Sequence, residues 1–338
     1  MKALVLAGPG DASLQQVEPP SAPAEDAILL EVRYVGLCGS DLNSYRGRNP
    51  LVSYPRILGH EVAATVAALT PGHPEWQPAT PVTLSPYTSC ARCASCLRGR
   101  PNACQFNETL GVQRDGALRE VIAVPASRLY RAALSLKELC LVEPLTVGFH
   151  AVARGRVESV DTVLVLGCGG VGLGAIAGAA FRGATVIGAD LDEAKLATAR
   201  NAGAAHTINT ASADLHTQLA ELTGGRGPDV VIEAIGLPQT FRAAVEEVAF
   251  TGRVVYIGYA KEQVAYETRL FVQKELDILG SRNAQPDDFR EVIRMLEARR
   301  FPVDEAVTHL VPLEEAPAIL RAWDREPAGF TKIMIEVA

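Results

Sequence analysis

The chain has 338 residues, with 39 acidic and 32 basic side chains and a formal net charge of -7 at pH 7. This balance offers no basic surface of the kind that binds nucleic acid, so we expect no nucleic-acid partner. Hydrophobic residues make up 48% and charged residues 21%, as in ordinary soluble globular proteins. The length exceeds what one hydrophobic core usually supports, which predicts two domains.

No stretch approaches the ~20 consecutive apolar residues that a membrane-spanning helix needs. The opening MKALVLAGPGDASL also lacks the longer apolar stretch and the cleavage site of a secretory signal. We therefore expect a soluble cytoplasmic protein with no membrane partner.

The first 145 residues favour strands. Short runs rich in valine, leucine, isoleucine and alanine are separated by Gly, Pro and Asp. They predict strands over residues 2–6, 27–35, 61–69, 81–84 and 117–124. A compact, partly closed β-rich domain follows.

Two motifs with metal-ligand residues lie in this segment, Cys38-Gly-Ser-Asp41 and Gly59-His60-Glu61. A cysteine, a histidine and a carboxylate are ligands that hold zinc at catalytic centres, where one position stays open for water or substrate. The alternative is that Cys38 is a small buried residue and that His60 and Glu61 merely precede an apolar run. We favour the catalytic metal site because both motifs occur together.

Four further cysteines follow with the spacing C-x2-C-x2-C-x7-C, at Cys90, Cys93, Cys96 and Cys104. Four thiolates complete a closed tetrahedral site with no room for substrate, which predicts a structural zinc. The alternatives are a reduced loop without metal and an iron-sulfur cluster. A cluster of that kind has a proline directly after its fourth cysteine, whereas Gln105 follows Cys104 here.

Glu143 precedes Pro144, a residue that suits the first turn of a helix, so we expect a helix to begin here. Glu143 is then either a carboxylate at the helix N-terminus or a further ligand of the Cys38 and His60 metal. Spacing in the sequence leaves both interpretations open.

From residue 146 the pattern changes to alternating strands and helices. A buried strand over residues 161–166 leads directly into a glycine-rich turn and then a helix to about residue 181. Glycines at the first, third and sixth positions of the turn are typical of dinucleotide binding, because they allow a tight turn, close approach of pyrophosphate and close helix packing. The turn is formed by Gly167, Cys168, Gly169, Gly170, Val171 and Gly172.

The next strand, over residues 184–189, is followed by Asp190. A carboxylate at this place accepts hydrogen bonds from the adenosine ribose and repels a 2′-phosphate, which predicts NAD rather than NADP. Lys195 is a candidate for the same ribose, or else a solvated helix lysine.

Further strands are expected over residues 205–208, 228–234, 252–257 and 275–280, with helices over 211–222, 239–249, 286–299 and 313–323 and a last strand over 331–337. Ile235, Gly236 and Gly258 lie at strand ends, where a dinucleotide crosses the carboxyl edge of the sheet. The fold class predicted for this part is α/β, with a Rossmann doubly wound parallel sheet.

In order and in spacing, these motifs resemble those of the zinc-dependent medium-chain dehydrogenases/reductases over essentially the whole chain. The resemblance implies a GroES-like β-rich catalytic domain formed by residues 1–145 and 286–338, with an NAD-binding Rossmann domain over 146–285. It also implies two Zn²⁺ per chain, NAD as cofactor, and a homodimer or homotetramer. By position, Cys38, His60, Glu61 and Glu143 match the catalytic zinc site of sorbitol-dehydrogenase-like members.

Two stretches, within residues 45–61 and over residues 274–283, are similar to the bacterial branch of L-galactonate and L-gulonate 5-dehydrogenases, which oxidise a secondary hydroxyl of a sugar acid. Arg46, Arg48 and Arg282 are then candidates to bind the substrate carboxylate. The alternatives are a polyol dehydrogenase for sorbitol, xylitol or galactitol, an L-threonine dehydrogenase, and a non-enzymatic NAD-binding sensor.

The resemblance further implies that the metal lowers the pKa of the substrate hydroxyl, that Ser40 takes its proton, and that hydride passes to the nicotinamide. Many relatives continue the proton relay through a histidine five residues after the cysteine, where this chain has Asn43. Asparagine does not titrate near pH 7, so we expect the proton to leave through the ribose and water, or through Glu61 or Glu143.

Overall fold

The computed structural model describes residues 1–20, 26–70 and 72–338. The chain forms two compact units, one made of Met1–Glu143 with Val303–Ala338 and the other of Pro144–Pro302. No helix in the described ranges is both long and apolar enough to cross a membrane.

The first unit is built on strands. A sheet of seven strands runs in the order β15-β16-β3-β5-β6-β8, and β7 pairs with β3 outside this path. A smaller sheet has the order β2-β1-β4. The strands are β1 (Lys2–Gly8), β2 (Asp11–Gln16), β3 (Ala27–Leu37), β4 (Arg56–Ile57), β5 (Glu61–Val66), β6 (Pro81–Leu84), β7 (Val121–Pro125), β8 (Leu129–Tyr130), β15 (His309–Pro312) and β16 (Ile333–Glu336).

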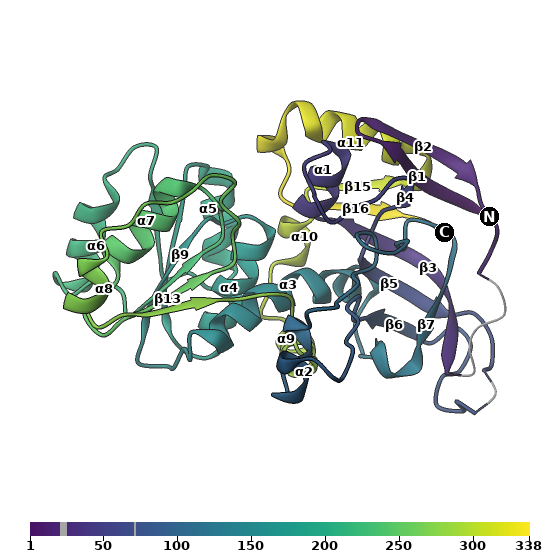
Figure 1. Cartoon of the computed structure of the whole chain (residues 1–338), viewed down its shortest axis with the longest axis horizontal. Helices are drawn as coiled ribbons and strands as arrows, with labels where there is room; N and C mark the ends of the chain where they lie inside the picture. Colours follow the sequence, from purple (N-terminus) through teal and green to yellow (C-terminus); the bar gives the residue numbers. More distant parts are fainter. Residues whose placement is uncertain (21–25, 71) are drawn as a thin grey trace. The chain divides into compact units, whose positions relative to one another are not determined.

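Short helices connect these strands: α1 (Gly39–Tyr45), α2 (Ala94–Leu97), α10 (Val303–Ala306) and α11 (Ala316–Arg325). The chain end belongs to this unit because β16 pairs antiparallel with β3, so that Ile333 lies opposite Leu37 (Figure 1). Residues from both ends of the sequence therefore share one hydrophobic core, which includes Leu4, Val35, Leu118 and Ile335.

The second unit holds a six-stranded parallel sheet with the order β11-β10-β9-β12-β13-β14. Helices connect successive strands and cover the sheet, which is the doubly wound Rossmann arrangement (Figure 1). Its strands are β9 (Thr162–Leu166), β10 (Thr185–Asp190), β11 (His206–Asn209), β12 (Val230–Glu233), β13 (Arg253–Tyr256) and β14 (Asp277–Gly280). Its helices are α4 (Gly170–Phe181), α5 (Glu193–Asn201), α6 (Leu215–Thr223), α7 (Pro238–Glu247), α8 (Arg269–Gln273) and α9 (Pro286–Glu297). The predicted fold class is confirmed.

The expected helix start at Glu143 and Pro144 is wrong. Helix α3 (Leu136–Arg154) begins earlier, and Pro144 lies inside it. The backbone N–H of Ser135 donates to the Glu138 carboxylate, and the N–H of Glu138 donates to the Ser135 hydroxyl. This capping box fixes the start of the helix, and the pattern Ser-x-x-Glu was present in the sequence.

The predicted boundary at residue 286 is also displaced. Residues 286–302 belong to the second unit, and the chain enters the first unit again at Val303. Helix α9 is held in the second unit because Asp288 pairs with the buried His150 at 2.9 Å and Glu291 pairs with Arg182 at 2.9 Å. Its apolar face, with Phe289, Val292 and Met295, is fully buried.

Candidate active site

Cys38, His60 and Glu61 converge in the first unit. Their ligand atoms all lie within 4.8 Å of one another. The antiparallel pairing of β3 with β5 places Gly36 opposite Glu61, and this register brings the end of β3 beside the start of β5. A side chain at Gly36 would displace the Glu61 carboxylate, because its Cβ would lie 2.0 Å from Glu61 Oε2.

Asp41 joins the two motifs and was given no role by the sequence. Its carboxylate accepts the backbone N–H of Cys38 at 2.8 Å and that of Gly59 at 3.3 Å. One of its oxygens lies 3.9 Å from His60 Nδ1. Burial raises the pKa of Asp41, partly offset by the nearby His60. Asp41 therefore fixes the backbone of both motifs and places a carboxylate near the imidazole, whose Nδ1 has no hydrogen-bond partner among the described residues.

Lys332 is a second residue that sequence reasoning missed. Its Nζ lies 2.6 and 2.7 Å from the two carboxylate oxygens of Glu61, and both side chains are buried. Although burial opposes a charge on Lys332, Glu61 raises the pKa of the lysine above its usual value. An isolated lysine just before the last strand carries no recognisable signal, because only the pairing of β16 with β3 brings it to Glu61.

Glu143 lies near this cluster, and the hydroxyl of Tyr87 donates a hydrogen bond to its carboxylate. Burial raises the pKa of Glu143 to about 7, and repulsion from Glu61 adds to the effect. Burial and Glu143 together hold the pKa of Tyr87 well above its usual value, so the phenol remains a donor. Tyr87 was likewise not predicted.

The cluster fits a divalent metal. It combines a thiol, an imidazole and a carboxylate, the donor set of catalytic zinc sites. Against the effect of burial, Asp41 and Cys38 raise the pKa of His60 well above its usual value, which shows that the surroundings favour positive charge. Among the described residues, Lys332 is the buried lysine at this cluster, and it faces four acidic or thiol groups: Cys38, Asp41, Glu61 and Glu143. A bound cation would relieve this excess of negative charge.

Ser40 and Asn43 lie on α1, directly after Cys38. The Ser40 hydroxyl oxygen is buried and has no hydrogen-bond partner among the described residues. A buried hydroxyl without a partner is costly, and a substrate hydroxyl at this place would satisfy it.

The four cysteines of the predicted structural site also converge. Their Sγ atoms lie within 4.8 Å of one another, with Cys93 Sγ 3.5 Å from that of Cys96 and 3.8 Å from that of Cys104. Backbone N–H groups of Cys90, Cys93 and Phe106 donate to sulfur atoms of the cluster. Hydrogen bonds, first from the Ser95 side chain, lower the pKa of Cys93 to about 5. These are the surroundings of thiolates that bind zinc.

The glycine turn of the second unit has the geometry that a pyrophosphate needs. Gly167 has φ +96°, and a Cβ there would lie 2.6 Å from Ile235. A Cβ at Gly172 would lie 1.8 Å from the Gly167 carbonyl oxygen, whereas the space beside Gly169 is open. The N-terminus of α4, with Gly170 and Val171, begins at this open space. An anion therefore fits here against free backbone N–H groups.

Asp190 ends β10 and also supports the turn, since its carboxylate accepts the backbone N–H groups of Cys168, Leu191 and Asp192. Three bonds leave about one of its four lone-pair positions for a ribose hydroxyl. Burial raises the pKa of the Cys168 thiol to about 12, partly offset by the positive charge of Lys195. Lys195 lies on α5, the helix that follows β10.

Glu233 organises the two neighbouring strand ends and was not predicted. Its fully buried carboxylate accepts the N–H groups of Ile235 and Gly236 and the hydroxyl of Thr240. A Cβ at Gly258 would lie 2.4 Å from Glu233 Oε2. The Glu233 side chain thus fixes the turn after β12, and the turn after β13 packs closely against it at Gly258.

Comparison with known proteins identifies the family. Residues 24–133 match the model of the alcohol dehydrogenase GroES-like domain, and residues 170–298 match that of the zinc-binding dehydrogenases. The chain is a zinc-type medium-chain dehydrogenase. It is an oxidoreductase that acts on CH–OH groups, with zinc and a nicotinamide dinucleotide as cofactors.

Relatives of this dehydrogenase cover nearly its whole length. It is 31% identical over 313 residues to the L-galactonate-5-dehydrogenase of Escherichia coli K12, with 92% of each chain covered. The structure of alcohol dehydrogenase RspB from E. coli CFT073 with NADH has a TM-score of 0.91 and 28% identity, and covers 100% of this chain and 99% of that one. A zinc-binding dehydrogenase of Sinorhizobium meliloti 1021 bound to NADP also has a TM-score of 0.91 and 28% identity, with 99% of both chains covered.

In this dehydrogenase the three arginines considered for substrate binding differ in their surroundings. Arg46 donates through Nε to an Asp324 carboxylate oxygen at 2.6 Å and through Nη2 to the Asp324 carbonyl at 2.8 Å. Arg46 is therefore already engaged with Asp324, and a substrate carboxylate would compete with this pair. Arg48 is exposed and lines a hollow of about 520 Å³ together with Tyr45 and Asp324. Arg282 is exposed after β14.

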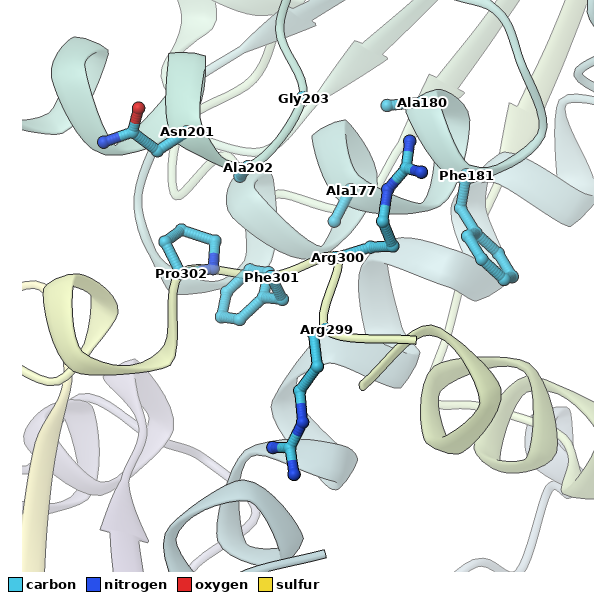
Figure 2. A pocket seen from close by; sticks show the side chains of 10 residues that line it. All are labelled: Ala177, Ala180, Phe181, Asn201, Ala202, Gly203, Arg299, Arg300, Phe301 and Pro302. Carbon is cyan, nitrogen blue, oxygen red and sulfur yellow. The ribbon is translucent and has the colours of Figure 1, made fainter. Parts of the chain in front are cut away.

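The dehydrogenase has another cavity of about 350 Å³ in the second unit (Figure 2). Its walls come from the carboxyl ends of α4 and α5 and from residues 299–302 after α9. The Arg300 guanidinium lies toward Ala180 and Phe181, and Arg299 points the other way (Figure 2). Since the dinucleotide turn is at the opposite end of α4, this cavity is separate from it. Because the carboxyl ends of helices disfavour anions, this cavity is not suited to bind the dinucleotide phosphates.

Proposed function

We propose that the chain is an NAD-dependent dehydrogenase that oxidises a secondary hydroxyl of a sugar acid such as L-galactonate or L-gulonate, with two Zn²⁺ per chain. The observation that carries the proposal is the cluster of Cys38 with the buried His60 and Glu61, together with the unpartnered hydroxyl of Ser40. The similarity to an L-galactonate-5-dehydrogenase supports the substrate class.

In this proposal Cys38, His60 and Glu61 hold the catalytic metal, with Glu143 beside them. Bound zinc supplies a positive charge that lowers the pKa of an alcohol hydroxyl toward neutrality. Ser40 accepts the hydroxyl proton, because its own Oγ has no competing partner. Asp41 holds the backbone of the Cys38 and Gly59 motifs together, and Lys332 holds the Glu61 carboxylate. Asn43 cannot continue the relay, so we assign the next step to the ribose and water or to Glu143.

The preference for NAD rests on Asp190. Its carboxylate is fixed by three backbone N–H groups, so a 2′-phosphate would meet a fixed negative charge. Ser40→Ala and Asp190→Ser test these two roles. We expect Ser40→Ala to lower turnover at least about tenfold. We expect Asp190→Ser to raise the ratio of NADP to NAD efficiency, with zinc content unchanged. Unchanged turnover in Ser40→Ala would contradict the role of Ser40, and an unchanged ratio of NADP to NAD efficiency in Asp190→Ser would contradict the role of Asp190.

The substrate class is tested with a panel of sugar acids, polyols and L-threonine, measured with NAD and with NADP before and after chelation. We expect a sugar acid with NAD to give the highest kcat/KM and chelation to abolish the activity. Arg48→Gln should lower kcat/KM about tenfold for sugar acids, the loss of one charge-assisted hydrogen bond, and leave polyols unaffected. A polyol oxidised faster than every sugar acid would contradict the proposal.

We also propose a homodimer or homotetramer. Strand β14 is the outer strand of its sheet, and its row of backbone groups and the exposed Ile278 offer a surface for another copy. Light scattering after size-exclusion chromatography should give a multiple of 35.9 kDa. A monomer would contradict this proposal.

A further inference from the structure

Tyr87 is the residue that relates the four-cysteine lobe, residues 86–107, to the candidate catalytic centre. Its hydroxyl donates to Glu143, whereas its backbone lies three residues before Cys90. The fold thus gives this lobe a direct hydrogen bond to a carboxylate of the catalytic centre, and both parts belong to the same unit.

The backbone around Tyr87 is held by the segment that follows the last cysteine. The N–H of Thr88 donates to Asn107 Oδ1 at 3.1 Å, and the N–H of Glu108 donates to the Thr88 hydroxyl at 2.6 Å. On the other side, the carbonyl of Pro86 accepts the N–H of Leu110 at 3.1 Å. The place of the tyrosine ring therefore depends on where residues 107–110 lie.

Those residues depend in turn on the cysteine cluster. Cys104 is fully buried, its sulfur accepts the N–H of Phe106 at 3.3 Å, and its carbonyl accepts the N–H of Asn107 at 3.2 Å. The lobe has little apolar packing of its own, since Leu97 is 74% exposed and Phe106 is 55% exposed. With no hydrophobic core, the lobe is held mainly by its sulfur atoms, and a metal there would determine its conformation.

We propose that the four-cysteine lobe positions the Tyr87 hydroxyl on Glu143, so that loss of the metal from the lobe loosens the catalytic metal centre. Tyr87 is a positioning residue in this scheme and Glu143 is the group it orients. The inference rests on the proposed assignment of Cys38, His60 and Glu61 as catalytic ligands. Partners that orient the groups around a metal typically change its affinity by about 10- to 100-fold.

The test measures release of the catalytic zinc from the full-length enzyme into a chromophoric chelator, without substrate. We expect Tyr87→Phe to shorten the half-time of release at least about tenfold. Cys96→Ser, which removes one sulfur ligand of the lobe, should shorten it to the same extent. The double variant should release the metal no faster than either single variant, because both changes break the same connection.

Tyr34→Phe is the matched control, because the Tyr34 hydroxyl donates an exposed hydrogen bond to Glu336, which is not one of the proposed zinc ligands, in the same unit. Zinc release from Tyr34→Phe should equal that of the unchanged enzyme. Native release from Cys96→Ser, or effects that multiply in the double variant, would overturn the proposal. If Cys96→Ser does not fold, Asn107→Ala replaces it, since this change cuts the contact to Thr88 and leaves all four cysteines.

The result is separable from the proposed function. A wrong substrate assignment does not alter zinc release. If His60→Ala retains two zinc ions per chain, the catalytic ligands are misassigned. If His60→Ala retains one zinc ion and Tyr87→Phe releases its catalytic zinc at the native rate, the ligand assignment stands and only the connection to the lobe is rejected.

Discussion

The two metal-ligand clusters of the first unit differ in donors and in surroundings. The Cys38, His60 and Glu61 cluster has three different donors, a fixed lysine on its carboxylate, and an unpartnered serine hydroxyl two residues after its cysteine. The four-cysteine cluster has four equal donors and backbone N–H groups directed at sulfur. With a metal bound, the first would leave a coordination position for chemistry and the second would be closed.

The surroundings explain why each cluster needs different support. The mixed cluster carries an excess of acidic groups, and Lys332 is fixed on the Glu61 carboxylate, where it offsets part of that excess. The four-cysteine cluster lies in a lobe whose apolar side chains are exposed, so the cluster is what holds the lobe in its conformation. One cluster is therefore expected to govern turnover and the other conformation.

The largest effect is expected from His60→Ala. Loss of an imidazole ligand should empty the mixed cluster and lower turnover at least about a thousandfold, because a metal supplies several kcal/mol of charge stabilisation. The four-cysteine metal should remain, which elemental analysis would show as one zinc per chain. His73→Ala, in a loop of the same unit, is the control and should keep both metals. Loss of both metals from His60→Ala would break the comparison.

Lys332→Met tests the charge balance. It leaves the Glu61 carboxylate buried without its partner and should lower the free energy of unfolding by about 3 kcal/mol in urea titrations of the metal-free protein. Lys332→Arg should recover most of the loss, and Lys2→Met, which breaks the exposed pair with Glu314, should change little.

The same pair has a defined pH dependence. Glu61 raises the pKa of Lys332 in the folded protein against the effect of burial, so the stabilisation is complete below the ordinary lysine value of 10.5 and is lost only as the pH rises past the raised value. A difference between Lys332→Met and the unchanged protein that disappears near neutral pH would contradict this account.

The smallest expected effect is the order of metal release. The mixed cluster has an open position that a chelator can enter, so activity should fall with the first zinc removed. The melting temperature should fall mainly with the second. Simultaneous loss of both ions, or a melting temperature that falls first, would show that the two clusters do not divide these roles.

Motifs that are local in the sequence could be predicted, and long-range partners could not. The glycine turn and the four cysteines each occupy one short stretch, so their spacing indicated what they form. Lys332 reaches Glu61 only because β16 pairs with β3, and a single lysine carries no pattern. Tyr87 and Glu143 are likewise far apart in the sequence and meet through the fold.

Two predictions about helices are wrong: the start of α3, for a local reason, and the unit to which α9 belongs, for a reason of packing. The start of α3 is set by the capping box of Ser135 and Glu138, a stronger signal than Pro144. Helix α9 was assigned to the wrong unit because its amphipathic pattern shows that it packs, and not against what. Its partners His150 and Arg182 are visible only in the structure.

The most direct test of the account is anomalous scattering at the zinc absorption edge from crystals of active enzyme. The account predicts one peak among Cys90, Cys93, Cys96 and Cys104, and a second among Cys38, His60 and Glu61. Active crystals with no peak at the second cluster would contradict it.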